Sequence, residues 1–85
     1  MRYLYLITTK GCQGCNIMRN VLDEHFSNIR VIVGDYKHVP AWIETNVKLT
    51  DFPTLVFIKD DVIKYHFSGT RSAGKIKEII KTLRF

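Results

Sequence analysis

Two short apolar runs, at residues 2–7 and 29–33, enclose a segment of helical periodicity. The runs are rich in Tyr, Leu, Ile and Val, which are favoured in buried strands. The apolar residues between them recur at helical spacing and predict a helix from about Cys12 to Phe26: Ile17, Met18, Val21, Leu22 and Phe26. A strand, a helix and a strand over about 30 residues form a βαβ unit, so the two strands should be parallel neighbours in one sheet.

A second strand-rich region follows at residues 54–67. Thr54–Lys59 (TLVFIK) has the strongest strand character in the chain. Asp60 and Asp61 then provide a tight two-residue turn, less favourable than Asn-Gly, into a second strand at 62–67. Together these features predict an antiparallel hairpin.

Helices are predicted on either side of this hairpin. Pro40 can stand in the first turn of a short helix over 40–46. Ser68-Gly69-Thr70 ends the hairpin, and Ser72 is suited to cap a closing helix. The apolar stripe of that closing helix contains Ile76, Ile79, Ile80 and Leu83.

The order βαβ, α, ββα predicts an α/β fold, a four-stranded mixed sheet flanked by three helices. Gly34-Asp35 is expected to end the second strand. The 85 residues contain no internal repeat or linker, so we expect residues 1–85 to form a single domain.

The composition limits the classes of function. Hydrophobic residues make up 46% of the chain, which is enough for one core and argues against disorder. The apolar run at 3–7 is too short for a signal peptide or a membrane span, so we expect a cytoplasmic protein without membrane attachment. The net charge of +5 comes from scattered Lys and Arg without a nucleic-acid-binding motif, so we expect no nucleic-acid partner.

Cys12 and Cys15, the only cysteines, fall at the start of the first predicted helix. Residues three apart on a helix share a face and lie close enough to form a disulfide. The unpaired N–H groups and the dipole at this helix end favour an anion and lower the pKa of a thiol such as that of Cys12. Cys15, one turn further on, should be better covered. We therefore expect Cys12 to attack a substrate disulfide and Cys15 to resolve the mixed disulfide, through a reversible Cys12–Cys15 disulfide and without a bound cofactor.

Two other uses of the cysteine pair stay open. A structural disulfide across a two-residue gap would remove little chain entropy, and the cytoplasm is reducing. A structural zinc site needs two more ligands, but His25, His38 and His66 lie at unsuitable spacings. A zinc ion shared between two molecules would meet the ligand count. We assign the histidines no role and predict no metal site within the chain.

The segment DFPTLVFIKDDVIKYHFSG, together with Cys-x-x-Cys after a strand, resembles the thioredoxin superfamily. The resemblance covers nearly the whole chain, but it does not include the extra N-terminal strand and helix of full-length thioredoxins. The size is closer to glutaredoxins and to compact thioredoxins of phages and archaea. The resemblance implies a cis bond before Pro53, facing the cysteines, which leaves backbone groups of Phe52 free to pair with an extended substrate. Substrate contacts are therefore expected at Gly11, Phe52, Pro53 and Gly69.

The chain departs from the thioredoxin pattern around the cysteines. Gly11 stands where thioredoxins usually have tryptophan. The dipeptide between the cysteines is Gln13-Gly14, rather than Gly-Pro or the Pro-Tyr of many glutaredoxins. Leu6 and Val31 replace the buried aspartate and the lysine that handle protons in typical thioredoxins, so we name no proton acceptor for Cys15.

The resemblance implies a thiol–disulfide oxidoreductase that reduces disulfides in partner proteins and takes its electrons from a thioredoxin reductase or from glutathione. We expect it to act as a monomer. Ribonucleotide reductase is a family-level candidate target. Thr70-Arg71-Ser72 lacks the acidic residues with which glutaredoxins bind glutathione, and this favours protein disulfides. Two alternatives stay open. One is a glutathione-dependent glutaredoxin, in which Lys10, Lys37 and Arg71 attract the carboxylates of glutathione. The other is a non-catalytic thioredoxin-like binding module.

Overall fold

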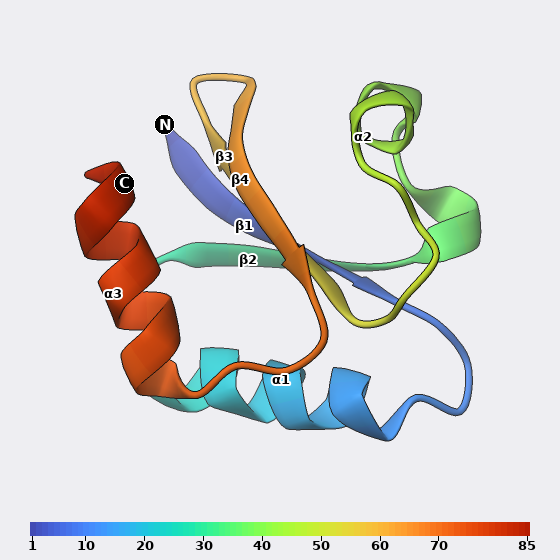
Figure 1. Ribbon diagram of the computed structural model, residues 1–85, viewed down its shortest axis with the longest axis horizontal. Helices are drawn as coiled ribbons and strands as arrows, with labels where there is room; N and C mark the ends of the chain where they lie inside the picture. The colour runs from blue at the N-terminus through green and yellow to red at the C-terminus, as the bar shows by residue number, and fades with distance from the viewer.

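The computed structural model describes residues 1–85 as one sheet with three α-helices and a single 3₁₀ turn, η1 (Figure 1). No helix is long and apolar enough to cross a membrane. Along the chain the elements are β1 (Arg2–Thr8), α1 (Gln13–His25), β2 (Arg30–Asp35), η1 (Tyr36–His38), α2 (Ala41–Asn46), β3 (Thr54–Lys59), β4 (Val62–Ser68) and α3 (Ala73–Leu83).

The four strands lie in the order β2-β1-β3-β4. The β1 and β2 strands are parallel, as a helical crossover between them requires, while β3 is antiparallel to both β1 and β4. The predicted α/β class, the mixed sheet of four strands, the βαβ unit and the hairpin are therefore confirmed. The two central strands, β1 and β3, hold most of the fully buried apolar side chains.

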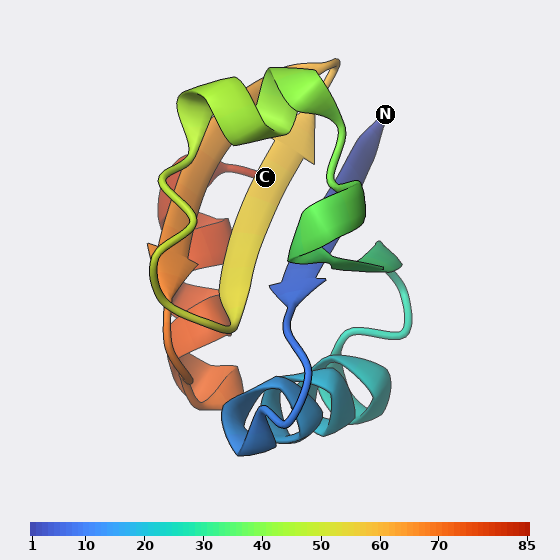
Figure 2. The same ribbon diagram turned by 90° about the vertical axis from the view of Figure 1, so that its right-hand side faces the viewer.

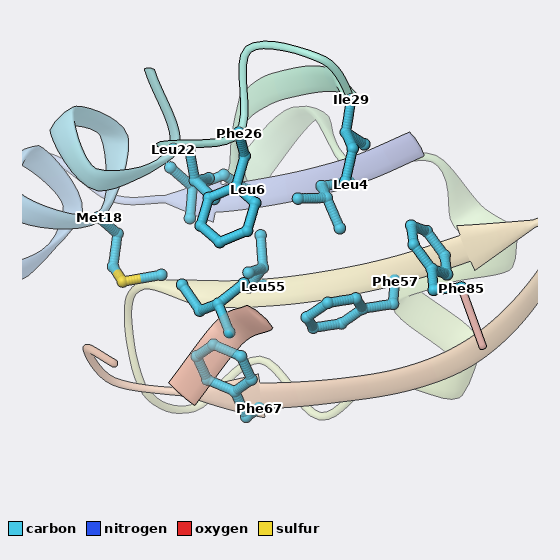
Figure 3. Close-up of a cluster of buried hydrophobic side chains, with 11 residues drawn as sticks. Leu4, Leu6, Met18, Leu22, Phe26, Ile29, Leu55, Phe57, Phe67 and Phe85 are labelled. Atoms are coloured by element: carbon cyan, nitrogen blue, oxygen red, sulfur yellow. The ribbon is translucent and has the colours of Figure 1, made fainter. Parts of the chain in front are cut away.

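Successive residues of the central strands face opposite layers, so β1 contributes to two cores. Leu4 and Leu6 belong to the larger core, which lies against α1 and α3 (Figure 3). Tyr5 and Ile7 belong to the smaller core, which α2 covers through Ile43. Figure 2 looks onto the α2 side, with α3 behind the strands.

The β2 strand ends with Gly34 and Asp35, as the sequence predicted. Gly34 lies close to the Tyr5 side chain of β1. A Cβ atom at Gly34 would lie 2.6 Å from the Tyr5 hydroxyl oxygen, so a larger residue there would force the Tyr5 ring to move. Burial raises the pKa of the Tyr5 phenol, and neighbouring Tyr3 raises it further. The strand ends after Asp35, whose carboxylate accepts a hydrogen bond from the Lys37 N–H at 2.9 Å and caps η1, an element that the sequence did not predict.

The helix boundaries follow local capping chemistry. Ser72 caps α3 by accepting a hydrogen bond from the Lys75 N–H, as predicted. The α2 helix begins at Ala41, directly after Pro40, close to the predicted range. The α1 helix begins at Gln13, so Cys12 is its N-cap residue rather than part of the helix.

Candidate redox site

Cys12 and Cys15 form a disulfide at the N-terminal end of α1. Their Cα atoms are 5.2 Å apart, within the usual range for bridged cysteines. The Sγ atom of Cys12 also accepts a hydrogen bond from the backbone N–H of Cys15 at 3.0 Å. In this position the sulfur takes the place that a serine or aspartate oxygen occupies in an ordinary N-cap, and the helix end favours negative charge on it.

The two sulfurs differ in access to solvent. Cys15 is 5% exposed, whereas Cys12 is only half-buried. A disulfide partner can therefore approach Cys12 more readily than Cys15. This inequality is the one that an attacking and a resolving thiol require.

Three chain segments meet at Gly14, between the two cysteines. A Cβ atom on Gly14 would lie 3.1 Å from Pro53 Cδ and 3.3 Å from Thr70 Cγ2, so the loops before β3 and after β4 both approach the start of α1. Farther along α1, the Met18 sulfur accepts a hydrogen bond from the Arg71 N–H at 3.4 Å. Glycine between the cysteines therefore permits close packing, a role that its position in the motif did not reveal.

The Phe52–Pro53 peptide bond is cis, as the resemblance implied. Thr54 holds this turn in place, because its hydroxyl donates to the Asp51 carbonyl at 2.7 Å and lies 3.0 Å from the Ser68 hydroxyl. No hydrogen bond within the chain uses the backbone N–H or C=O of Phe52. Both groups are therefore free to pair with an extended segment of another molecule.

Gly69 and Gly11 border the site with left-handed backbone conformations, at φ values of 89° and 72°. The Gly69 N–H donates to the Pro53 carbonyl at 2.8 Å, which joins the loop after β4 to the proline turn. A Cβ atom on Gly11 would meet nothing within 4 Å, so the backbone conformation rather than crowding favours glycine there.

An aromatic pair flanks the proline turn on the α2 side. The rings of Tyr36 and Phe52 lie 5.3 Å apart between centroids, and Tyr36 is 38% exposed. Phe52 was predicted at the site, but Tyr36 was not, because it belongs to the unpredicted η1 turn. Together the two rings form an apolar border beside Pro53.

The side chains that replace the proton-handling pair are apolar and covered in the structure. Leu6 is fully buried, and Val31 is partly buried against the same core. The Arg71 guanidinium donates to the Ser68 and Thr70 carbonyls and lies 4.8 Å from the centre of the Phe67 ring. One guanidinium nitrogen of Arg71 is therefore engaged within the loop. No three His, Cys, Asp or Glu side chains come together where they could hold a metal ion.

A hollow of about 360 Å³ opens on the other side of the cysteine pair, between the start of α1 and the ends of β1 and β2. Apart from the two cysteines and Gly11, none of the residues that line this hollow was predicted at the site. One signal was available: Cys12, Asn16 and Arg19 are spaced for one helical face. The lining residues are Thr8, Thr9, Gly11, Cys12, Gln13, Cys15, Asn16, Arg19 and Val33.

Solved thioredoxin structures match the chain over nearly its whole length. Thioredoxin-2, a component of malaria parasite protein secretion machinery, is 15% identical, with a TM-score of 0.78 over 96% of this chain and 82% of that one. Chloroplastic thioredoxin z is 20% identical, with a TM-score of 0.70 over 99% and 79% of the two chains. Oxidised thioredoxin O2 from Arabidopsis thaliana is 18% identical, with a TM-score of 0.70 over 98% and 75%.

No protein-family model and no curated protein matches the chain. At identities of 15–20%, the structural matches concern the fold, and they show that this chain has a thioredoxin-like fold. The predicted fold is therefore confirmed. The chain combines this thioredoxin-like fold with a Cys-x-x-Cys pair that forms a disulfide.

Proposed function

From this thioredoxin-like fold and its bridged cysteine pair, we propose that the chain reduces disulfides in partner proteins, with Cys12 as nucleophile and Cys15 as resolving thiol. The observation that carries the proposal is the unequal placement of the two sulfurs. Cys12 is only half-buried at a helix N-cap, and Cys15 is buried one turn further on. The Cys15 N–H donates to the Cys12 sulfur and favours its thiolate form in the reduced protein.

The reaction proceeds in two exchange steps. The Cys12 thiolate attacks one sulfur of the substrate disulfide, forms a mixed disulfide and expels the other substrate sulfur as a thiolate. Cys15 then loses its proton and attacks the Cys12 sulfur. The Cys12–Cys15 disulfide forms, and the second substrate sulfur leaves as a thiolate. Two electrons pass to the substrate, and a reductase returns them to the cysteine pair.

The surface around Cys12 supports a protein as the substrate. The free backbone groups of Phe52 can pair with an extended strand, while the Tyr36 and Phe52 rings offer apolar contact beside it. We propose a thioredoxin reductase as the electron source and the cytoplasm as the place of action, with the chain acting as a monomer. Ribonucleotide reductase is the candidate partner that the family resemblance suggests.

Two coupled assays test this function. Insulin-disulfide reduction is measured with NADPH and thioredoxin reductase, and separately with glutathione and glutathione reductase. We expect turnover with thioredoxin reductase. Turnover with glutathione alone would favour the glutaredoxin alternative, and turnover in neither system would favour a binding module.

Cysteine variants test the assignment of roles. The Cys15→Ser variant should retain substrate as a mixed disulfide on Cys12, because no resolving thiol is present. The Cys12→Ser variant is the matched control and should retain none, since Cys15 is buried. Mass spectrometry without reductant measures both adducts. Equal trapping by the two variants would contradict the assigned roles.

A further inference from the structure

The hollow beside the cysteines contains several polar groups that have no partner within the chain. Side chains of Thr9, Gln13, Asn16 and Arg19 line it, and none of the four makes a hydrogen bond to another residue. Thr8, by contrast, donates to the Gly34 carbonyl at 3.4 Å. Because both cysteines line the same hollow, a group bound there would lie next to the reacting sulfurs.

The only charge on the lining of the hollow is positive. Arg19 is the only charged residue that lines it, and no salt bridge within the chain engages its guanidinium. Asp35 pairs with Thr8 in the β1–β2 ladder, but it does not line the hollow, and its carboxylate accepts from the Lys37 N–H. The hollow therefore favours an anion with a planar pair of oxygens, the partner that guanidinium binds best.

The position of Arg19 limits the distance between the bound anion and the reacting sulfurs. Arg19 follows Cys12 by seven residues, a rise of about 10 Å along the helix axis. Long side chains on a helix point back toward its N-terminus, so the guanidinium can extend toward the cysteines. A carboxylate that it contacts would be separated from the attacked sulfur by only one or two residues of a peptide, or by the short arm of a small thiol.

We propose that this hollow binds a carboxylate carried by the disulfide substrate, close to the sulfur that Cys12 attacks, and that Arg19 determines this preference. The proposal rests on the proposed function and specifies its substrate class. The shared chemistry is a carboxylate near the reacting sulfur, supplied by an acidic side chain in a protein or by a small acidic thiol. Gln13 and Asn16 supply neutral donors around the same group.

Two sets of disulfide substrates test the proposal, and the first set consists of small molecules. The reduced protein is mixed with dithiodipropionate, which carries two carboxylates, or with bis(hydroxyethyl) disulfide, which is neutral. Acid quenching and mass spectrometry give the rate at which the Cys12–Cys15 disulfide forms. The Arg19→Gln variant should lower the ratio of anionic to neutral rates about three-fold at low salt, with a smaller effect at high salt, as for a solvent-exposed ion pair.

Arg30→Gln is the matched control, because it removes the same charge at the opposite end of β2. Arg30 pairs with Tyr3, five ladder positions from the Thr8–Asp35 pair, and it does not line the hollow. Its replacement should leave the ratio of rates nearly unchanged. An equal decrease in both variants would mean that overall charge attracts the anion, and it would overturn the site.

Peptide disulfides with Asp or Asn next to the reacting cysteine form the second set. A preference for Asp that disappears in Arg19→Gln identifies a protein side chain as the source, whereas an effect confined to dithiodipropionate identifies a small thiol. No effect of Arg19 with either set, with the neutral disulfide still reduced, overturns the carboxylate site and leaves the reductase intact. If no disulfide is reduced at all, the proposed function itself fails.

Discussion

Gly14 and Gly74 are each the second residue of a helix, but their surroundings differ. A Cβ atom on Gly74 would meet only the Ser72 hydroxyl oxygen, at 3.9 Å. At Gly14 the same atom would press on Pro53 and Thr70 at 3.1 and 3.3 Å. Gly14 therefore permits the approach of the proline turn to the cysteines, whereas Gly74 serves no packing purpose.

The two glycines make a matched pair of substitutions. Gly74→Ala should raise the free energy of unfolding by about 0.5–1 kcal/mol, because alanine favours the helix. Gly14→Ala should give no such gain, since the added methyl group must displace Pro53 or Thr70. Urea unfolding of the oxidised proteins measures both values. Equal stabilisation by the two substitutions would show that the loops around Gly14 yield without cost.

The β3–β4 hairpin shows how turn chemistry acts on a whole element. Asp60 and Asp61 both have left-handed backbones, at φ values of 52° and 62°, and they connect the paired residues Lys59 and Val62. Positive φ at both central residues is the pattern of a type I′ turn, whose twist suits a two-residue hairpin. Aspartate tolerates this conformation better than most residues, but less well than glycine.

Replacing the second turn residue tests this account. Asp61→Gly should raise the free energy of unfolding by about 0.5–1 kcal/mol, because glycine adopts the left-handed conformation without a Cβ clash. Asp61→Ala also removes the carboxylate, but the alanine Cβ atom clashes in the left-handed conformation. This variant should therefore have a lower free energy of unfolding. Thermal unfolding of the three proteins gives the order. An alanine variant as stable as the glycine variant would contradict the turn assignment.

The end of α3 joins a local motif to the packing of the whole molecule. Arg84 adopts a left-handed backbone, and the Phe85 N–H donates to the Ile80 carbonyl at 3.0 Å, as in a Schellman motif. This turn directs Phe85 back onto the sheet, where it is 7% exposed. Its ring meets Phe57 edge-on, with centroids 5.6 Å apart, inside the larger core (Figure 3).

Phe85 should therefore contribute to global stability. Phe85→Ala is expected to lower the free energy of unfolding by about 3 kcal/mol, because it leaves a cavity against Phe57. Phe85→Leu fills part of that space and should cost less. The total free energy of unfolding of a small domain is only about 5–15 kcal/mol, so urea unfolding will resolve the difference between the two variants. If Phe85→Ala lowers the free energy of unfolding by less than about 1 kcal/mol, Phe85 is not part of the cooperative core.

The elements and the outline of the site were accessible from local sequence patterns. Periodicity located the strands and α1, and the N-cap at Ser72 located the start of α3. The cis bond before Pro53 came from family resemblance rather than from the residues themselves. The η1 turn and the contact between Gly34 and Tyr5 escaped prediction, because a 3₁₀ turn has no apolar period and the contact involves a residue of the neighbouring strand.

The sequence by itself determined which residues form strands and helices and which two cysteines can meet, since these depend on neighbours within a few positions. Only the tertiary structure decided what surrounds the cysteine pair. It placed Pro53 against Gly14, joined Met18 to Arg71 across 53 positions, and opened the hollow beside Arg19. These features depend on how the sheet and α1 pack together, and no local pattern encodes a distance between residues so far apart along the chain.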